Sequence, residues 1–191
     1  MKTLSKEEFL KNVNFYLQEM ETGKIFVYPT DTIYGLGCDA TNSLSIKKIR
    51  EIKMRNSKPF SIIVPSKEWI KENCVINFLA ESWINKLPGR YTLILRLKKF
   101  KGVARKELLI GTYTIGIRIP DNWFFTVIEK FGKPFVTTSV NLSGADNMTS
   151  LSDIDENIKA KIDYFIDEGS LENSPSKIID LTDGEKIVRR Y

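Results

Sequence analysis

The alternation of apolar and polar positions predicts helices and strands along most of the chain. Residues 5–21 carry apolar side chains at helical spacing, and Ser5 stands three residues before Glu8, as in a capping box. This pattern predicts one amphipathic helix that Gly23 ends. The β-branched and aromatic run at 25–28 predicts a buried strand directly after it.

A second amphipathic helix is predicted behind a loop at 29–40. Asn42 or Ser43 can cap this helix, which should end near residues 53–55. The side chains expected to face the core are Leu44, Ile46, Ile49 and Ile52. This helix is about 18 Å long, so its far end would lie well away from the loop at 29–40. If both serve one site, the sheet must curve into a cavity or the substrates must span the distance.

Predicted helices and strands continue to alternate in the middle of the chain, and the last third is predicted to be mostly extended. The predicted helices are residues 69–87 with a break near 74–75, residues 123–131 capped by Asp121, and a short helix capped by Ser152 or Asp153 that ends at Lys161. The predicted strands are residues 60–64, 93–97, 114–119, 135–138, 164–167, 177–180 and 186–189. Strands separated by helices, followed by a strand-rich tail, indicate an α/β domain with a mixed sheet.

Length and composition set the class of protein. The chain has 191 residues, 42% of them hydrophobic, which suits one domain over residues 1–191. The N-terminus lacks the apolar core of a signal peptide, and no apolar run approaches the ~18 residues of a membrane span. The two cysteines stand in unrelated contexts. We therefore expect a cytoplasmic protein with no membrane partner.

Charge and the missing histidine narrow the chemistry. The chain contains no histidine, which excludes a Ser-His-Asp hydrolase and histidine-containing zinc sites. The net charge of +5 favours anionic partners such as nucleotide phosphates or RNA, although surplus lysine is also a common solubility device. The basic loop at 98–106 is interpreted first as a solvated surface and second as an RNA contact.

Two polar loops and a group of cations carry the candidate chemistry. The loop at 29–40 is rich in hydroxyls and glycine, and a second polar loop follows the strand at 135–138. Lys53, Arg55 and Lys58 place three positive charges within six residues, as a triphosphate would require, although cations also favour helix C-termini. Lys53 and Arg55 are expected to face solvent at the helix end. An internal carboxylate, a bound carboxylate or a phosphate could pair with the strand arginine Arg118.

Several separated blocks resemble one known family. Residues 29–36, Pro-Thr-Asp-Thr-Ile-Tyr-Gly-Leu, resemble the signature loop of the YrdC-like family. Further blocks follow in the family order over nearly the whole chain: Lys53-Met54-Arg55, Pro88-Gly89 with Tyr91-Thr92, Gly116-Ile117-Arg118, Ser139-Val140-Asn141, Pro175-Ser176 with Ile178-Ile179-Asp180, and Val188-Arg189. The resemblance implies a twisted mixed β-sheet, flanked by helices around a large basic cavity.

The resemblance also implies an activity. Family members are nucleotidyltransferases that make threonylcarbamoyl-AMP and pyrophosphate from L-threonine, bicarbonate and ATP, for modification of tRNA at the adenosine beside the anticodon. ATP would be a substrate that carries Mg²⁺, tRNA could bind directly, and a partner transferase would take up the adenylate. The motif residues implied in catalysis are Lys53, Arg55, Ser139 and Asn141. Those implied around threonine are Thr32, Arg118, Thr137 and Ser176. Those implied around the nucleotide are Arg55, Lys58, Thr114, Ser139, Asn147 and Arg189.

Departures from the family pattern leave two alternatives. Lys58 follows Arg55 one residue sooner than usual, Ile63 stands where a histidine is common, and Lys177 replaces a threonine. The glycine that usually follows the last arginine is also missing. The alternatives are a module that binds double-stranded RNA or tRNA without chemistry, and a YciO-like paralogue with weak or different activity. The intact Ser139-Val140-Asn141 motif argues against the paralogue.

Overall fold

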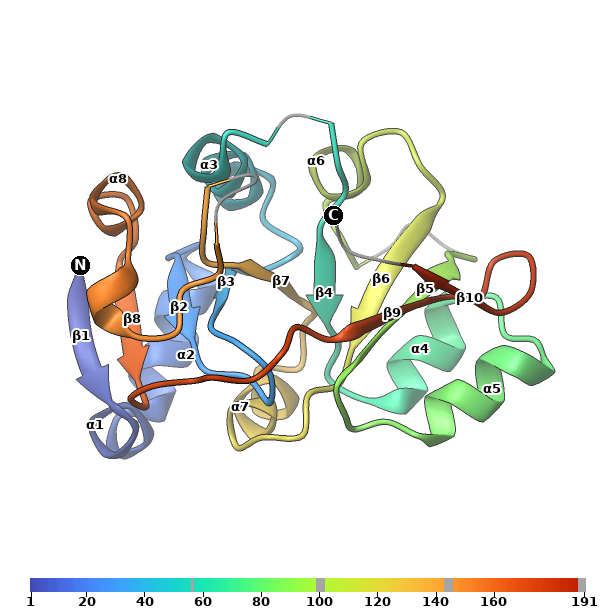
Figure 1. Cartoon of the computed structure of the whole chain (residues 1–191), viewed down its shortest axis with the longest axis horizontal. Helices are drawn as coiled ribbons and strands as arrows, with labels where there is room; N and C mark the ends of the chain where they lie inside the picture. The colour runs from blue at the N-terminus through green and yellow to red at the C-terminus, as the bar shows by residue number, and fades with distance from the viewer. Residues whose placement is uncertain (56, 99–101, 143–145, 189–191) are drawn as a thin grey trace.

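A mixed β-sheet runs through the computed structural model, which describes residues 1–55, 57–98, 102–142 and 146–188. The strands in these residues are β1 Lys2–Ser5, β2 Phe26–Tyr28, β3 Gly35–Gly37, β4 Ser61–Ile63, β5 Tyr91–Arg96, β6 Thr114–Arg118, β7 Phe135–Ser139, β8 Tyr164–Asp167, β9 Lys177–Asp180 and β10 Lys186–Val188. Their order across the sheet is β1-β8-β2-β3-β7-β4-β6-β5-β9-β10 (Figure 1). The sheet contains parallel pairs, such as β4 with β6 and β5 with β9, and antiparallel pairs, such as β3 with β7.

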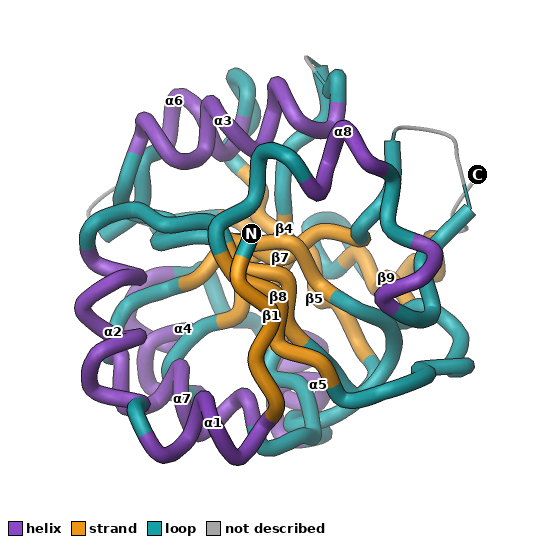
Figure 2. Tube along the Cα trace, turned by 90° about the vertical axis from the view of Figure 1, so that its left-hand side faces the viewer, coloured by secondary structure: helices purple, strands orange, loops and turns teal. Residues whose placement is uncertain are grey.

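Helices flank this sheet on two sides. They are α1 Lys6–Lys11, α2 Val13–Glu21, α3 Ser43–Lys53, α4 Lys67–Asn73, α5 Phe78–Asn85, α6 Arg105–Leu109, α7 Phe124–Phe131, α8 Glu156–Lys159 and the short 3₁₀ helix Leu151–Asp153. The side view shows the strands running between one group formed by α3, α6 and α8 and another formed by α1, α2 and α7 (Figure 2). The predicted α/β class with a twisted mixed sheet is therefore confirmed. Among the helices described, none is long and apolar enough to cross a membrane.

Two hydrophobic clusters hold the layers together. The larger cluster joins aliphatic residues of the central strands to α3, α4, α5, α6 and α8. The smaller one is rich in aromatic residues and joins α1, α2 and α7 to the sheet. In it, Phe9 stacks on Tyr16 with ring centroids 4.9 Å apart, and Tyr28 stacks on Phe124 at 4.4 Å. Offset aromatic pairs of this kind add to the stabilisation from buried area.

The N-terminal helix differs from the prediction. The capping box of Ser5 and Glu8 is confirmed, but the helix breaks at Asn12, whose side-chain amide donates to the Glu8 carbonyl at 3.2 Å. An asparagine side chain that bonds nearby backbone competes with helix continuation, so α1 and α2 are separate. The strand β1 before them was not predicted. In the next helix, Asn42 is the cap, whereas Leu44 faces solvent with 70% of its surface exposed.

Several predicted caps and loops are also corrected. Asp121 does not cap α7, because its backbone N–H bonds the Asp31 carboxylate and α7 has no side-chain cap. Asp155 caps the last helix instead of Ser152 or Asp153. Two elements form inside predicted loops, α6 at the end of 98–106 and β3 within 29–40. Residues 99–101 and the predicted strand end at Arg189 lie outside the described residues.

One exposed backbone position predicts a stabilising substitution. Met54 ends α3 in the left-handed region with φ 49° and ψ 41°, and three quarters of its surface is exposed. We expect Met54→Gly to raise the free energy of unfolding by about 1 kcal/mol, because glycine adopts this conformation without steric strain. Urea unfolding measures the change. Lys48→Gly in the middle of α3 is the matched control and should lower stability by about 1 kcal/mol. A loss of stability in Met54→Gly would contradict the strain argument.

Candidate active site

A cavity of about 570 Å³ brings most of the predicted site residues together. Those on its lining are Thr32, Lys53, Arg55, Lys58, Arg118, Thr137, Ser139, Asn141, Asn147 and Ser176. Thr114 does not line it: although it points to the same side of β6 as Gly116 and Arg118, it lies at the other end of the strand. Arg189 lies outside the described residues.

Strand pairing explains how α3 reaches the loop at 29–40. Gly35 in β3 lies directly opposite Ser139 at the end of β7. The end of α3 lies beside the same strand end, since the Lys53 ammonium is 2.6 Å from the Ser139 carbonyl oxygen. The pairing of β3 with β7 thus brings the end of α3 close to the loop at 29–40, and Lys53 and Thr32 line the same cavity.

The cavity has two ends along the strand direction. Thr137, Ser61 and Gly116 lie in one row across β7, β4 and β6. Ser139 lies two residues beyond this row in one direction and Arg118 two residues beyond it in the other, because β7 and β6 run in opposite directions. Four residue positions correspond to about 13 Å. An extended ligand several bonds long can therefore contact both ends.

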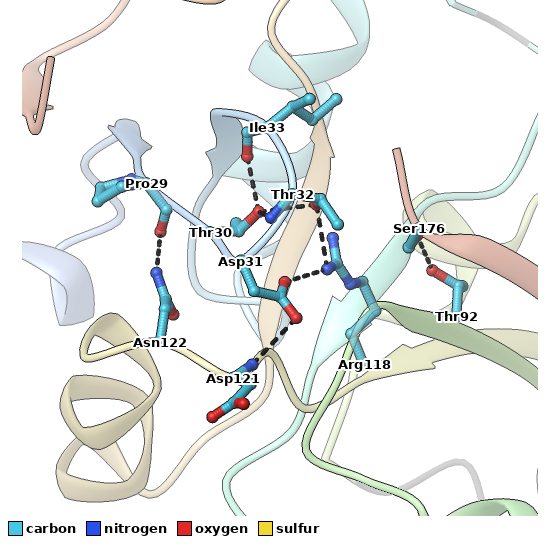
Figure 3. Close-up of polar contacts among 10 residues, drawn as sticks. All are labelled: Pro29, Thr30, Asp31, Thr32, Ile33, Thr92, Arg118, Asp121, Asn122 and Ser176. Atoms are coloured by element: carbon cyan, nitrogen blue, oxygen red, sulfur yellow. Dashed lines mark hydrogen bonds and ion pairs between the residues drawn. The ribbon is translucent and has the colours of Figure 1, made fainter. Parts of the chain in front are cut away.

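Arg118 marks the first end and is fixed by a buried ion pair. One Nη atom donates to the Asp31 carboxylate at 2.6 Å and to the Thr32 hydroxyl at 3.2 Å (Figure 3). Both charged side chains are at most 7% exposed, and Asp31 also accepts the Asp121 backbone N–H at 3.1 Å. Of the open alternatives, the internal carboxylate is confirmed as the partner. The Arg118 Nε is buried with no hydrogen-bond acceptor, so the guanidinium retains capacity for a further anion.

Hydroxyl pairs surround Arg118. Ser176 and Thr92 lie beside it and share a hydrogen bond of 2.7 Å between their buried hydroxyls (Figure 3). Thr30 and Thr32 form a second pair at 2.9 Å, and Thr30 donates to the Ile33 carbonyl at 2.7 Å. Thr30 and Thr92 were not among the predicted site residues. Both stand inside the quoted motif blocks, which were the signal that could have found them.

Lys53 marks the second end and joins the two predicted motifs. Its ammonium donates to the Ser139 carbonyl at 2.6 Å, the Asn141 carbonyl at 2.7 Å and the Asn141 side-chain oxygen at 2.9 Å. The Ser139 hydroxyl donates to the same Asn141 oxygen at 2.7 Å. The prediction that Lys53 faces solvent is wrong, because it is only 2% exposed. The long Lys53 side chain reaches the main chain at the end of β7 instead of extending into solvent.

Arg55 and Lys58 also line this end of the cavity. Arg55 is half-buried rather than solvent-facing, donates to the Pro59 carbonyl at 2.8 Å, and lies 5.1 Å from the Phe60 ring centre. Its Nε is buried without an acceptor, and burial lowers the pKa of its guanidinium. Lys58 is exposed. With Lys53, these side chains give this end of the cavity its positive charge.

The ionisation of Lys53 predicts a pH effect on anion binding. Burial, and secondarily the charge of Arg55, lower the pKa of Lys53 to about 7, while its three oxygen acceptors match the three protons of the ammonium. Above this pKa the free protein loses the proton, so affinity for a non-hydrolysable ATP analogue should fall as pH rises from about 7 to about 9.

Calorimetric titration at several pH values measures this effect. Lys53→Met should bind more weakly and lose the pH dependence, whereas Lys58→Ala, which removes an exposed cation, should keep it. An affinity that is independent of pH in the wild-type protein would contradict the assignment to Lys53.

The lining residues that the structure describes include cations but no carboxylate. Lys53, Arg55, Lys58 and Arg118 face the cavity, and none of the described lining residues is Asp or Glu. The undescribed segments also contain no Asp or Glu. Within the described part of the chain, no cluster of Cys, Asp or Glu could hold a metal ion. The site is therefore suited to bind small anions.

These features define an α/β domain with a basic, hydroxyl-lined cavity of about 570 Å³. The family model of the Sua5, YciO and YrdC proteins, described as Telomere recombination, matches residues 18–190. The chain belongs to this family, as its sequence blocks predicted.

Individual relatives span most of the chain. A Methanocaldococcus jannaschii protein, provisionally named threonylcarbamoyl-AMP synthase, is 39% identical over 97% of this chain and 87% of its own length. Escherichia coli YciO, described as uncharacterized, is 31% identical over 93% of this chain and 87% of its own length. Sua5 from P. abyssi, solved in complex with L-threonine, superposes with a TM-score of 0.85 at 26% identity and covers 98% of this chain. The chain spans only 56% of that longer protein.

Proposed function

We propose that this protein is a threonylcarbamoyl-AMP synthase that uses L-threonine, bicarbonate and ATP and releases pyrophosphate. The observation that carries the proposal is the contact of Lys53 with Ser139 and Asn141, which assembles the two motifs beside a cavity that holds Arg118 at its other end. The names of the M. jannaschii relative and of the threonine complex of Sua5 support it. An RNA-binding module would not need this arrangement inside a cavity.

The Arg118 end is proposed to hold threonine. The guanidinium, already fixed by Asp31, would bind the threonine carboxylate through its remaining donors. Thr32, Thr137 and Ser176 would present hydroxyls to the rest of the amino acid, and Thr92 would orient Ser176. Because the arginine is held before the ligand arrives, binding costs little side-chain entropy.

The positive charge of the cavity is proposed to keep the threonine amine in its neutral, nucleophilic form. Carbamate formation needs the neutral amine of threonine. The amine nitrogen attacks the carbon of bicarbonate and gives up one proton, with which the bicarbonate hydroxyl leaves as water. Among the described lining residues, four are cations and none is a carboxylate, which would disfavour the ammonium form and lower its pKa. The site can thus activate the amine without histidine or a carboxylate base.

The Lys53 end is proposed to hold ATP. Arg55, Lys58 and Lys53 would neutralise the phosphates, with Ser139, Asn141 and Asn147 as hydrogen-bonding neighbours. A carbamate oxygen attacks the α-phosphorus and the bond to pyrophosphate breaks. The magnesium ion would enter as part of the ATP substrate. Arg189 retains its proposed nucleotide role, and the adenylate would pass to a transferase that acts on tRNA in the cytoplasm.

Pyrophosphate release by the purified protein tests this function. With ATP, bicarbonate and Mg²⁺ present, release should require L-threonine and should be much weaker with L-serine, which lacks the γ-methyl group that the pocket can contact. Omitting bicarbonate should abolish release. Release that is independent of threonine would overturn the proposal.

A further inference from the structure

Arg50 occupies an unusual position beneath the cation-bearing end of the cavity. It lies on α3 one turn before Lys53 and is only 8% exposed, although arginine is rarely buried to this extent without a specific partner. It does not line the cavity. No motif pointed to it in the sequence.

The guanidinium of Arg50 binds main-chain carbonyls from two segments. One Nη donates to the carbonyls of Arg55 and Lys58, each at 3.0 Å. The Nε donates to the Glu107 carbonyl at 2.6 Å and the other Nη to the Leu108 carbonyl at 3.2 Å, both in α6. The rigid fork of one side chain therefore ties the end of α3, the following loop and α6 together.

Further contacts fix Arg55 relative to Arg50. The Arg50 carbonyl accepts the Arg55 backbone N–H at 3.0 Å, so the two residues are joined in both directions. Both guanidinium groups also contact the buried Phe60 ring, at 4.4 Å for Arg50 and 5.1 Å for Arg55. Arg50 thus donates hydrogen bonds to the main chain of the two cationic residues, Arg55 and Lys58, that line this end of the cavity.

We infer that Arg50 is a positioning residue that sets Arg55 and Lys58 at the spacing required by the nucleotide phosphates, an inference that rests on the proposed function. Phosphate binding by fixed cations depends on where the charges are held, because an ordered site does not reorganise when the ligand arrives. Lysine could not replace Arg50, since its three donors on one nitrogen cannot reach four carbonyls spread over two segments.

The test compares nucleotide and threonine affinities in Arg50→Ala and Arg50→Lys. In Arg50→Ala, we expect the dissociation constant for a non-hydrolysable ATP analogue to rise by about ten- to a hundredfold, because Arg55 and Lys58 would no longer be held in place. That for L-threonine should stay within about twofold, because Arg118 lies at the far end of the cavity. Arg50→Lys keeps the charge and the apolar stem for folding, and should still weaken nucleotide binding. Ethylguanidine should restore affinity in Arg50→Ala by occupying the vacated site.

A matched control and a second readout separate positioning from general damage. Arg96→Ala removes an exposed arginine paired with Asp183 and should change neither affinity. Hydrogen exchange in Arg50→Ala should accelerate at the bonded amides of Met54, Arg55 and Phe60 but not at 30–35. Unchanged nucleotide affinity in folded variants, or equal weakening of both ligands, would overturn the inference. A wild-type protein that binds the analogue but makes no adenylate would overturn only the proposed function, and one that binds no nucleotide would overturn both.

Discussion

Replacing Lys53 by alanine is expected to reduce threonine-dependent pyrophosphate release by about a hundred- to a thousandfold, the usual cost of losing a preorganised donor at a reacting centre. Two losses contribute to this effect. The cavity loses a cation, and the turn at Ser139 and Asn141 loses the ammonium that three of its oxygen atoms share. Steady-state pyrophosphate release at saturating substrates measures the loss.

The same substitution should also affect folding. Lys53→Ala leaves partly buried oxygens without this donor, which should lower the free energy of unfolding by about 1–3 kcal/mol. Lys58→Ala is the matched control, because Lys58 is exposed in the same cavity and should weaken ATP binding without a stability loss. Release by Lys53→Ala at the rate of Lys58→Ala would contradict the central place given to Lys53.

Replacing Arg118 by alanine is expected to produce the largest stability loss, together with the loss of threonine binding. The substitution leaves the Asp31 carboxylate buried and without its cation. Breaking a buried pair in this way typically costs about 3–5 kcal/mol. Urea unfolding measures the stability, and calorimetry with L-threonine measures the binding.

A double substitution distinguishes the structural role of Arg118 from its binding role. Arg118→Ala with Asp31→Ala removes both buried charges, so stability should recover relative to the single variant. Threonine affinity should not recover, because the guanidinium is still absent. Threonine binding by the double variant at wild-type affinity would show that Arg118 serves only the fold.

Local signals in the sequence predicted most elements well. The cap of α3 is an example: the Asn42 side chain accepts the backbone N–H groups of Leu44 and Ser45, each at 3.1 Å, within three residues. The predicted break near 74–75 likewise agrees with the gap between α4 and α5. The split at Asn12 was missed because its side chain competes with the helix from inside an otherwise regular apolar pattern.

Long-range contacts limited the prediction of the site. The motif blocks contain most of the lining residues, but they did not indicate that Lys53 is buried against Ser139, 86 positions away along the chain. A lysine at a helix end is usually solvated, and only the pairing of β3 with β7 places an acceptor within its reach. Arg50 was missed for a related reason, since bonds to main-chain carbonyls require no particular residue type in the partner segment.

The most direct test of the central claim is detection of the product itself. The purified protein is incubated with ATP, Mg²⁺, L-threonine and isotopically labelled bicarbonate, and the mixture is analysed at once by mass spectrometry. The account predicts threonylcarbamoyl-AMP that carries the label in its carbamoyl carbon, in amounts equal to the pyrophosphate released. A folded protein that binds ATP and L-threonine but forms no labelled adenylate would contradict it.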